Sequence, residues 1–268
     1  MTIRVDKDGE TAIVTIDRPQ ARNAVDPATA EALFRAFVEF ERDAAARVAV
    51  LTGAGGAFCA GFDLKHAANA IDEAWFAEHD LDASFDGRDD RPRKGPMGPT
   101  RLTLSKPVIA AIAGPAVAGG MELALWCDLR VMERTAYMGV YCRRFGVPLI
   151  DGGTVRLPRI VGHGRAMDLI LTGRQIRAEE CHEWGLATRL CGEGKALETA
   201  LELARDLARF PQGCMRADRV SAIRQWSLGP EAALANEWRS AETFRKEGRE
   251  GAGRFASGKG RGGDFGEF

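Results

Sequence analysis

Short apolar runs alternate with longer amphipathic stretches along the first half of the chain. Each run is bounded by Gly, Pro or charged residues, which is typical of buried strands. The predicted strands are residues 12–16, 48–51, 108–113 and 129–132. Between the first two, Asp26 and Pro27 predict a helix start, because Asp is a favoured N-cap and Pro a favoured first residue. This alternation of strands and helices indicates an α/β core.

The segment 106–128, KPVIAAIAGPAVAGGMELALWCD, combines a buried strand, a glycine turn and the start of a buried helix. The turn Ala118-Gly119-Gly120 lets the backbone come close to a ligand, since glycine has no Cβ. Glu122 falls in the first turn of the helix predicted over 121–126. The helix end stabilises its carboxylate while apolar neighbours penalise the charge, which is how a proton-transfer group is tuned. Backbone donors next to such a carboxylate suggest enolate chemistry.

The composition changes twice further along the chain. Residues 66–100 carry many charges and end in Gly95-Pro96-Met97-Gly98-Pro99, which predicts a mobile insertion with one helix near 71–79. Beyond residue 195 the pattern is helical, over 197–210, 215–226 and 230–247, and a flexible glycine-rich tail is expected over 251–268. We therefore expect a core at 1–195, with a variable insertion at about 66–100, and a C-terminal helical region at 196–268.

Charge and cysteine content limit the possible partners. The 268 residues are 45% hydrophobic and carry a net charge of −1, which gives no global attraction to nucleic acid or to a membrane surface. The six cysteines form no C-x-x-C pair, and neither a signal peptide nor a membrane-spanning run is evident. A cytoplasmic protein that binds a small molecule, or a second copy of itself, is expected.

Two motifs fail on closer inspection. Gly53-Ala54-Gly55-Gly56 lacks the third glycine of a dinucleotide-binding fingerprint, because position 58 is Phe. His182-Glu183 begins a zinc-binding H-E-x-x-H motif, but Leu186 stands where the second His belongs. No metal site is predicted.

The chain resembles the enoyl-CoA hydratase/isomerase (crotonase) family over roughly residues 3–190. The matching motifs occur in family order: Asp17-Arg18-Pro19 with Arg22-Asn23-Ala24-Val25; residues 48–53 with 58–64; residues 106–128; and residues 146–173. The resemblance implies a spiral of ββα units with a C-terminal helical subdomain that contacts neighbouring subunits. It also implies a homotrimer or a dimer of trimers, and a coenzyme A thioester as substrate with no separate cofactor.

The same resemblance implies roles for individual residues. Phe62 and Gly119 match the two oxyanion-hole positions, whose main-chain N–H groups bind the thioester oxygen; both could instead lie in simple connecting turns. Glu122 matches the first catalytic glutamate, or could serve only as a charge at a helix N-terminus. Substrate contacts are expected from a further set: Arg22, Ala24, Ala60, Asp63, Leu64, Gly120, Tyr141 and Cys142.

The second family glutamate is missing, because its position falls on Cys142. A thiol has an ordinary pKa of about 8.5 and activates water poorly. Asp151 is a candidate substitute, since dienoyl-CoA isomerases of the family carry a catalytic aspartate in a similar D-x-G-T setting. Asp151 could equally N-cap the following helix by accepting from the Thr154 N–H.

The expected activity is hydration of a 2-enoyl-CoA through an oxyanion-stabilised enolate. Double-bond isomerisation by Glu122, Asp151 or both is the enzymatic alternative, because one carboxylate can move a proton without holding water. An acyl-CoA-binding protein with impaired catalysis is the alternative from another class.

Overall fold

The computed structural model describes residues 2–81, 93–263 and 266. The part of the predicted insertion at 82–92 and the end of the glycine-rich tail lie outside the described residues. The chain forms two compact units, residues 1–207 and 208–268, which are described separately.

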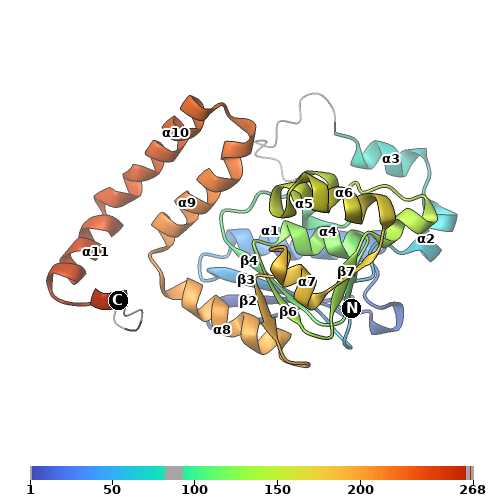
Figure 1. Ribbon diagram of the computed structural model, residues 1–268, viewed down its shortest axis with the longest axis horizontal. Helices are drawn as coiled ribbons and strands as arrows, with labels where there is room; N and C mark the ends of the chain where they lie inside the picture. Colours follow the sequence, from blue (N-terminus) through green and yellow to red (C-terminus); the bar gives the residue numbers. More distant parts are fainter. Residues whose placement is uncertain (1, 82–92, 264–265, 267–268) are drawn as a thin grey trace. The chain divides into compact units, whose positions relative to one another are not determined.

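The first unit contains two sheets (Figure 1). The strands of the larger sheet, in spatial order, are β1 (Ile3–Asp8), β2 (Thr11–Ile16), β3 (Val48–Gly53), β4 (Val108–Ile112), β6 (Leu129–Glu133) and β9 (Arg189–Cys191). β1 and β2 pair antiparallel, and each later neighbour is parallel. The smaller sheet consists of β5 (Pro115–Val117), β7 (Tyr137–Gly139) and β8 (Gln175–Arg177).

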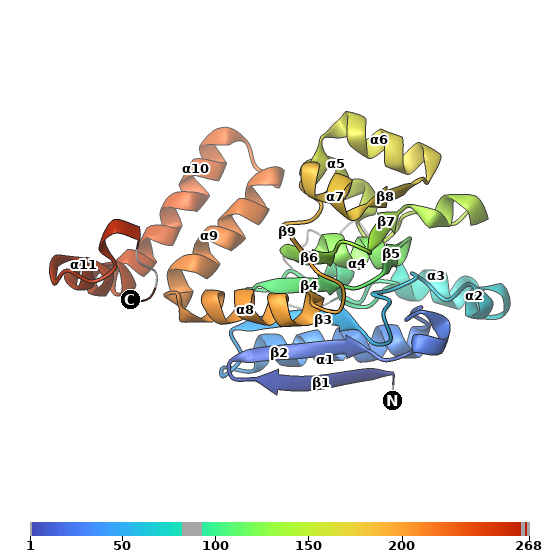
Figure 2. The same cartoon turned by 60° about the horizontal axis from the view of Figure 1, so that its bottom comes forward.

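The helices of this unit pack around the sheets. They are α1 (Pro27–Arg42), α2 (Leu64–Ala70), α3 (Glu73–His79), α4 (Gly119–Trp126), α5 (Gly153–Val161), α6 (His163–Thr172), α7 (Ala178–Glu183) and α8 (Ala196–Arg209). Three short 3-10 helices are η1 (Pro19–Ala21), η2 (Pro99–Arg101) and η3 (Tyr141–Phe145). Helix α4 lies between the larger sheet and the α5–α6 pair (Figure 2). Its first turn therefore faces the loops that precede α5.

The predicted strands at 12–16, 48–51, 108–113 and 129–132 are confirmed as β2, β3, β4 and β6. Helix α1 begins as predicted: the Asp26 side chain accepts from the Thr29 N–H at 2.8 Å, and Pro27 is the first helical residue. Leu33 and Phe37 of its apolar stripe are fully buried. The insertion carries α3 where one helix was expected. Strand β1 was not predicted, because most of its side chains are polar and exposed. Strands β5, β7, β8 and β9 were not predicted either, because three-residue strands leave no readable alternation.

The second unit consists of helices. They are α9 (Gln212–Arg224), η4 (Gln225–Ser227), α10 (Pro230–Arg239), η5 (Ser240–Arg245), α11 (Glu247–Ala256) and η6 (Arg261–Gly263). The single helix expected over 230–247 is divided by a 3-10 segment. The flexible tail expected from Gly251 is wrong for residues 251–256, which complete α11. In the part of the chain that the structure describes, no helix is long and apolar enough to cross a membrane.

Candidate active site

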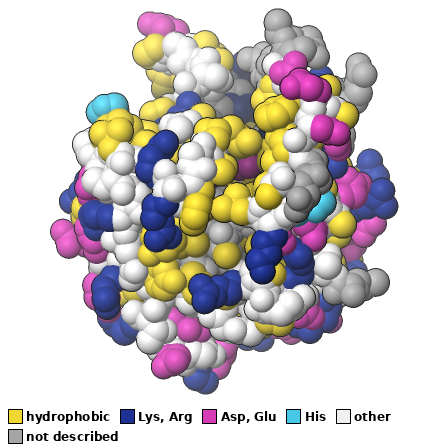
Figure 3. Space-filling view, turned by 90° about the vertical axis from the view of Figure 1, so that its right-hand side faces the viewer, with side chains coloured by type: hydrophobic (Ala, Val, Ile, Leu, Met, Phe, Trp, Pro, Cys, Tyr) yellow, Lys and Arg dark blue, Asp and Glu magenta, His cyan; other side chains and the backbone are white. Residues whose placement is uncertain are grey.

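A cavity of about 450 Å³ lies in the first unit, where segments that are distant in sequence meet. Predicted site residues line it from several elements: Arg22, Ala60, Phe62, Leu64, Gly119, Glu122, Tyr141, Cys142 and Asp151. On the side of the molecule where α2 and α3 lie, hydrophobic side chains gather around a central hollow with Lys and Arg side chains about them (Figure 3). The fold therefore brings most of the predicted site into one cavity.

Three predicted substrate contacts do not line this cavity among the described residues: Ala24, Asp63 and Gly120. The Ala24 carbonyl accepts a hydrogen bond from the Arg18 guanidinium. Asp63 N-caps α2 by accepting from the Lys65 N–H at 3.1 Å, and it forms an ion pair with Arg18 at 3.1 Å. At Gly120, an added Cβ would lie 2.1 Å from the Cys59 carbonyl oxygen. These residues hold the surrounding loops together.

The two predicted oxyanion-hole loops are pressed against each other. Gly61, which precedes Phe62, has φ +97°, and a Cβ there would lie 2.9 Å from the Gly119 nitrogen. Only glycine permits both this conformation and this close approach. Among the described residues, no hydrogen-bond acceptor is assigned to the N–H of Phe62 or of Gly119. Both residues line the cavity, as their predicted role in binding a ligand through the main chain requires.

Ala118, the residue before Gly119, has φ 52° and ψ −127°. This conformation is rare for a residue with a Cβ and costs on the order of 1–3 kcal/mol. The surroundings enforce it: the Ala118 N–H donates to the Gly139 carbonyl at 2.9 Å, and its carbonyl accepts from Met121 and Glu122. Strain is thus held at the residue that sets the direction of the Gly119 N–H.

Glu122 is 3% exposed and lies in the first turn of α4. Its Oε1 accepts from the N–H of Asp151 at 2.9 Å and of Gly153 at 2.8 Å, so the carboxylate meets the N-terminus of α5. Burial, followed by the negative charge of Asp151, raises the pKa of Glu122 from 4.5 to about 7, against the effect of these two hydrogen bonds. A carboxyl group with this pKa exists in both protonation states near neutral pH.

Asp151 does not cap α5. The N-cap is Gly152, without a side-chain cap, and the helix starts at Gly153. Asp151 Oδ1 instead accepts from the Met97 N–H at 3.0 Å and from the Thr100 hydroxyl. Burial raises the pKa of Asp151, and these two hydrogen bonds oppose the rise. The capping interpretation is therefore wrong, and Asp151 is a second buried carboxylate on the cavity wall.

Arg156 supports this arrangement and was not singled out from the sequence. Its guanidinium donates to the Asp151 carbonyl at 2.8 Å and to the Thr100 carbonyl at 2.6 Å. It thereby fixes the turn at 95–100 against the segment that precedes α5. Its place in the G-G-T-x-R-L motif was the available signal, but the motif did not reveal which carbonyls it would meet.

Cys142 lies in η3, buried at the cavity wall. Burial, with the negative charge of Glu122, raises the pKa of its thiol, so the thiol is protonated at neutral pH. Next to it, the Arg144 guanidinium carbon lies 4.2 Å from the centre of the Tyr141 ring. This part of the wall provides packing and a fixed cation but no carboxylate. In the described part of the chain, no cluster of three or more His, Cys, Asp or Glu side chains could hold a metal ion.

The chain belongs to the enoyl-CoA hydratase/isomerase family, whose model matches residues 6–92 and 93–259. Enoyl-CoA hydratase EchA19 of Mycobacterium tuberculosis is 38% identical over 232 residues, covering 85% of this chain and 82% of that protein. Carnitinyl-CoA dehydratase of Salmonella arizonae is 38% identical over 213 residues, covering 78% and 75%.

Solved structures agree with this assignment. A crystal structure of enoyl-CoA hydratase from Mycobacterium tuberculosis has a TM-score of 0.83 with 34% identity, covering 96% of both chains. One from Bacillus anthracis has a TM-score of 0.84 with 31% identity, again covering 96% of both. The expected crotonase fold is confirmed, and the chain is a member of a family of acyl-CoA enzymes.

Proposed function

We propose that this protein hydrates a 2-enoyl-CoA, with Glu122 and Asp151 as the two carboxylates of the reaction. The observation that carries the proposal is their placement: both are buried on the wall of the cavity that Phe62 and Gly119 also line. Standard hydration needs two carboxylates around one water, and the residue at the second family position, Cys142, does not supply one. Asp151 provides the missing group from another segment.

The thioester oxygen would accept from the Phe62 and Gly119 N–H groups. Donors aimed at an oxygen that gains negative charge lower the energy of an enolate. Because the Asp151 pKa is raised, ionised Asp151 is a stronger base than an ordinary carboxylate. It takes a proton from water as the water oxygen bonds to C3 and the double-bond electrons move toward the thioester oxygen.

Protonated Glu122 then delivers its proton to C2, and the enolate electrons form the new C–H bond. The hydrogen bonds of Glu122 among the described residues all fall on Oε1, which leaves Oε2 for the transferred proton. A pKa of about 7 suits this step, because neither proton release nor recapture is strongly uphill at neutral pH.

Isomerisation is the second candidate. Cys142 stands where the second family glutamate would be, and Glu122 alone can move a proton between two carbons without holding a water molecule. In that reaction Glu122 removes a proton from C2 or C4 of an enoyl-CoA and returns it to the other carbon. The site needs no bound water for this, and the oxyanion donors act on the same enolate oxygen.

Product analysis separates these activities. Purified protein is incubated with crotonyl-CoA and with a 3-enoyl-CoA, and products are identified by mass and chromatography. Gain of one water supports hydration, and a shifted double bond at unchanged mass supports isomerisation. Unchanged substrate with measurable acyl-CoA binding would contradict both and identify an acyl-CoA-binding protein.

Coenzyme A recognition and assembly form part of the proposal. Arg22, whose φ of 50° holds it in the left-handed region, would contact the phosphates from the cavity wall.

A homotrimer or a dimer of trimers would cover exposed apolar side chains of the C-terminal unit, such as Leu234 and Trp238. Light scattering of the purified protein measures this; a monomer at micromolar concentration would contradict it.

A further inference from the structure

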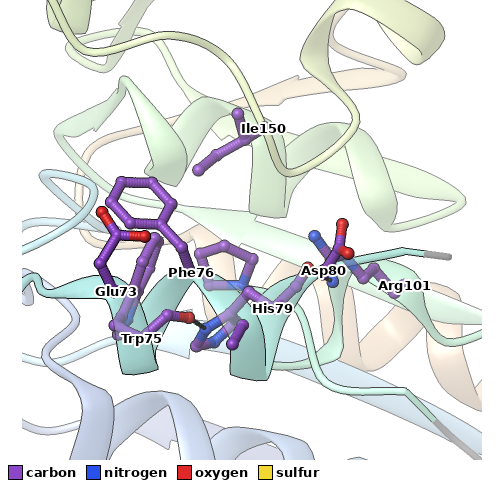
Figure 4. A pocket seen from close by; sticks show the side chains of 9 residues that line it. Glu73, Trp75, Phe76, His79, Asp80, Arg101 and Ile150 are labelled. Atoms are coloured by element: carbon purple, nitrogen blue, oxygen red, sulfur yellow. Dashed lines mark hydrogen bonds between the residues drawn. The ribbon is translucent and has the colours of Figure 1, made fainter.

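A second cavity of about 420 Å³ lies on the other side of one wall of the candidate active site. The two cavities share a set of apolar wall residues: Trp75, Phe76, Pro96 and Ile150. Trp75 and Phe76 come from α3, and Ile150 comes from the segment above it (Figure 4). These four side chains therefore border both cavities.

Pro96 is buried and Trp75 half-buried in this wall, whereas Phe76 and Ile150 are exposed. The Trp75 ring packs edge-on against Phe62, with centroids 5.9 Å apart, so the wall touches the proposed oxyanion loop. Phe76 is 58% exposed and Ile150 is 44% exposed, so few buried contacts hold these two side chains in place. The Phe76 ring meets the Trp75 ring edge to face, with centroids 5.3 Å apart. Because Phe76 is largely exposed, its side chain can move without disturbing the core.

The second cavity has a rim with hydrogen-bonding and charged groups, which include Glu73, His79, Asp80 and Arg101. The Arg101 guanidinium donates to the His79 carbonyl at 2.6 Å and so fixes the end of α3 to η2. Asp80 and Arg101 lie on the same side of the cavity (Figure 4). With two carboxylates and one guanidinium, the rim carries a net negative charge, which disfavours a negatively charged occupant, while the shared wall favours methylene groups.

We propose that the second cavity receives the distal part of a linear, uncharged acyl chain whose thioester end occupies the first. This inference rests on the proposed acyl-CoA function and names its substrate class as medium- or long-chain rather than short-chain. Trp75 and Phe76 are then the residues that determine how far the chain extends.

Replacement of Ala77 by Trp tests the proposal. Ala77 lines the second cavity but not the first, and its side chain is exposed on α3. The matched control is Ala68→Trp, at an exposed alanine of α2 that lines neither cavity. For each protein, kcat/KM is measured with crotonyl-CoA and with trans-2-dodecenoyl-CoA. We expect Ala77→Trp to lower the dodecenoyl-to-crotonyl ratio at least tenfold and Ala68→Trp to leave it within twofold.

Equilibrium binding of butyryl-CoA and dodecanoyl-CoA, measured by calorimetry, gives a readout that does not depend on turnover. Each methylene buried by wild type should tighten binding about fourfold, and Ala77→Trp should remove much of this gain. If no substrate turns over but the chain-length effect on binding is lost in Ala77→Trp, the proposed function is wrong, whereas the assignment of the second cavity to the acyl chain is supported. A chain-length profile that is the same in wild type and Ala77→Trp would overturn the inference.

Discussion

The two sides of the active-site cavity are built differently. On the α4–α5 side, Glu122 is buried and its Oε1 is held by two main-chain N–H groups, while Asp151 is held by Met97 and Thr100. On the α3 side, Phe76 stands more than half exposed. On the first side, hydrogen bonds hold the two carboxyl groups in fixed positions, as proton transfer to and from a substrate requires. The second can adapt to an acyl chain without changing the chemistry.

The largest expected effect is that of Glu122→Gln on turnover. The amide oxygen of Gln can still accept from the Asp151 and Gly153 N–H groups, so the fold should persist, but the group can no longer transfer a proton. We expect kcat with the preferred enoyl-CoA to fall on the order of 1000-fold. Steady-state kinetics measure this, with a thermal melt as control. A fall of less than tenfold in a folded variant would assign Glu122 a structural role.

Stability should depend on pH through the same residue. Folding raises the pKa of Glu122 from 4.5 to about 7, so the folded state favours the neutral carboxyl group. The associated stabilisation is present below about pH 4.5 and is lost as the pH rises through about 7, on the order of 3 kcal/mol. Urea unfolding of wild type and Glu122→Gln between pH 5 and 8.5 checks this. Equal pH slopes in the two proteins would contradict the shifted pKa.

Asp151→Asn tests whether the second carboxylate takes part. Asn can still accept from Met97 and Thr100, and we expect a fall in hydration of roughly 100-fold. Because the Asp151 charge raises the Glu122 pKa, its removal should also move the Glu122 limb of the residual pH–rate profile to lower pH. An unshifted profile would show that the Asp151 charge does not affect the pKa of Glu122. An unchanged rate would show that Asp151 takes no part in hydration.

A smaller effect is expected at Ala118. Gly adopts φ 52°, ψ −127° without strain, so Ala118→Gly should stabilise the protein by about 1 kcal/mol after the entropic cost of glycine. The freed loop should position the Gly119 N–H less well, and kcat should fall several-fold. Chemical denaturation and kinetics on the same sample measure both. A destabilised variant would mean that Ala118 carries no strain.

The smallest change is expected on the α3 side. Phe76→Ala removes a largely exposed ring and should alter the free energy of unfolding by no more than about 0.5 kcal/mol. Denaturant unfolding measures this. A loss above about 2 kcal/mol would show that Phe76 is locked in place and that the two sides of the cavity are equally rigid.

The local part of the site could be predicted from the sequence, because it lies within one strand–turn–helix unit. The position of Glu122 in the first turn of a buried helix followed from residues 106–128, and the family motifs located Phe62 and Gly119. The partners of Glu122 could not be predicted, since the Asp151 and Gly153 N–H groups are about thirty residues away. A D-x-G-T pattern fits both a helix cap and a buried carboxylate, and tertiary contacts from Met97 and Thr100 decided between them.

Hydrogen exchange at C2 of a saturated acyl-CoA tests the central claim most directly, because it requires an enolate but neither water addition nor double-bond migration. Butyryl-CoA or a longer homologue is incubated with the protein in D₂O, and deuterium at C2 is followed by NMR. The expected result is exchange with wild type well above the uncatalysed rate and its loss in Glu122→Gln. Bound acyl-CoA without exchange in wild type would show that the two amides and the buried carboxylate do not act together on an enolate.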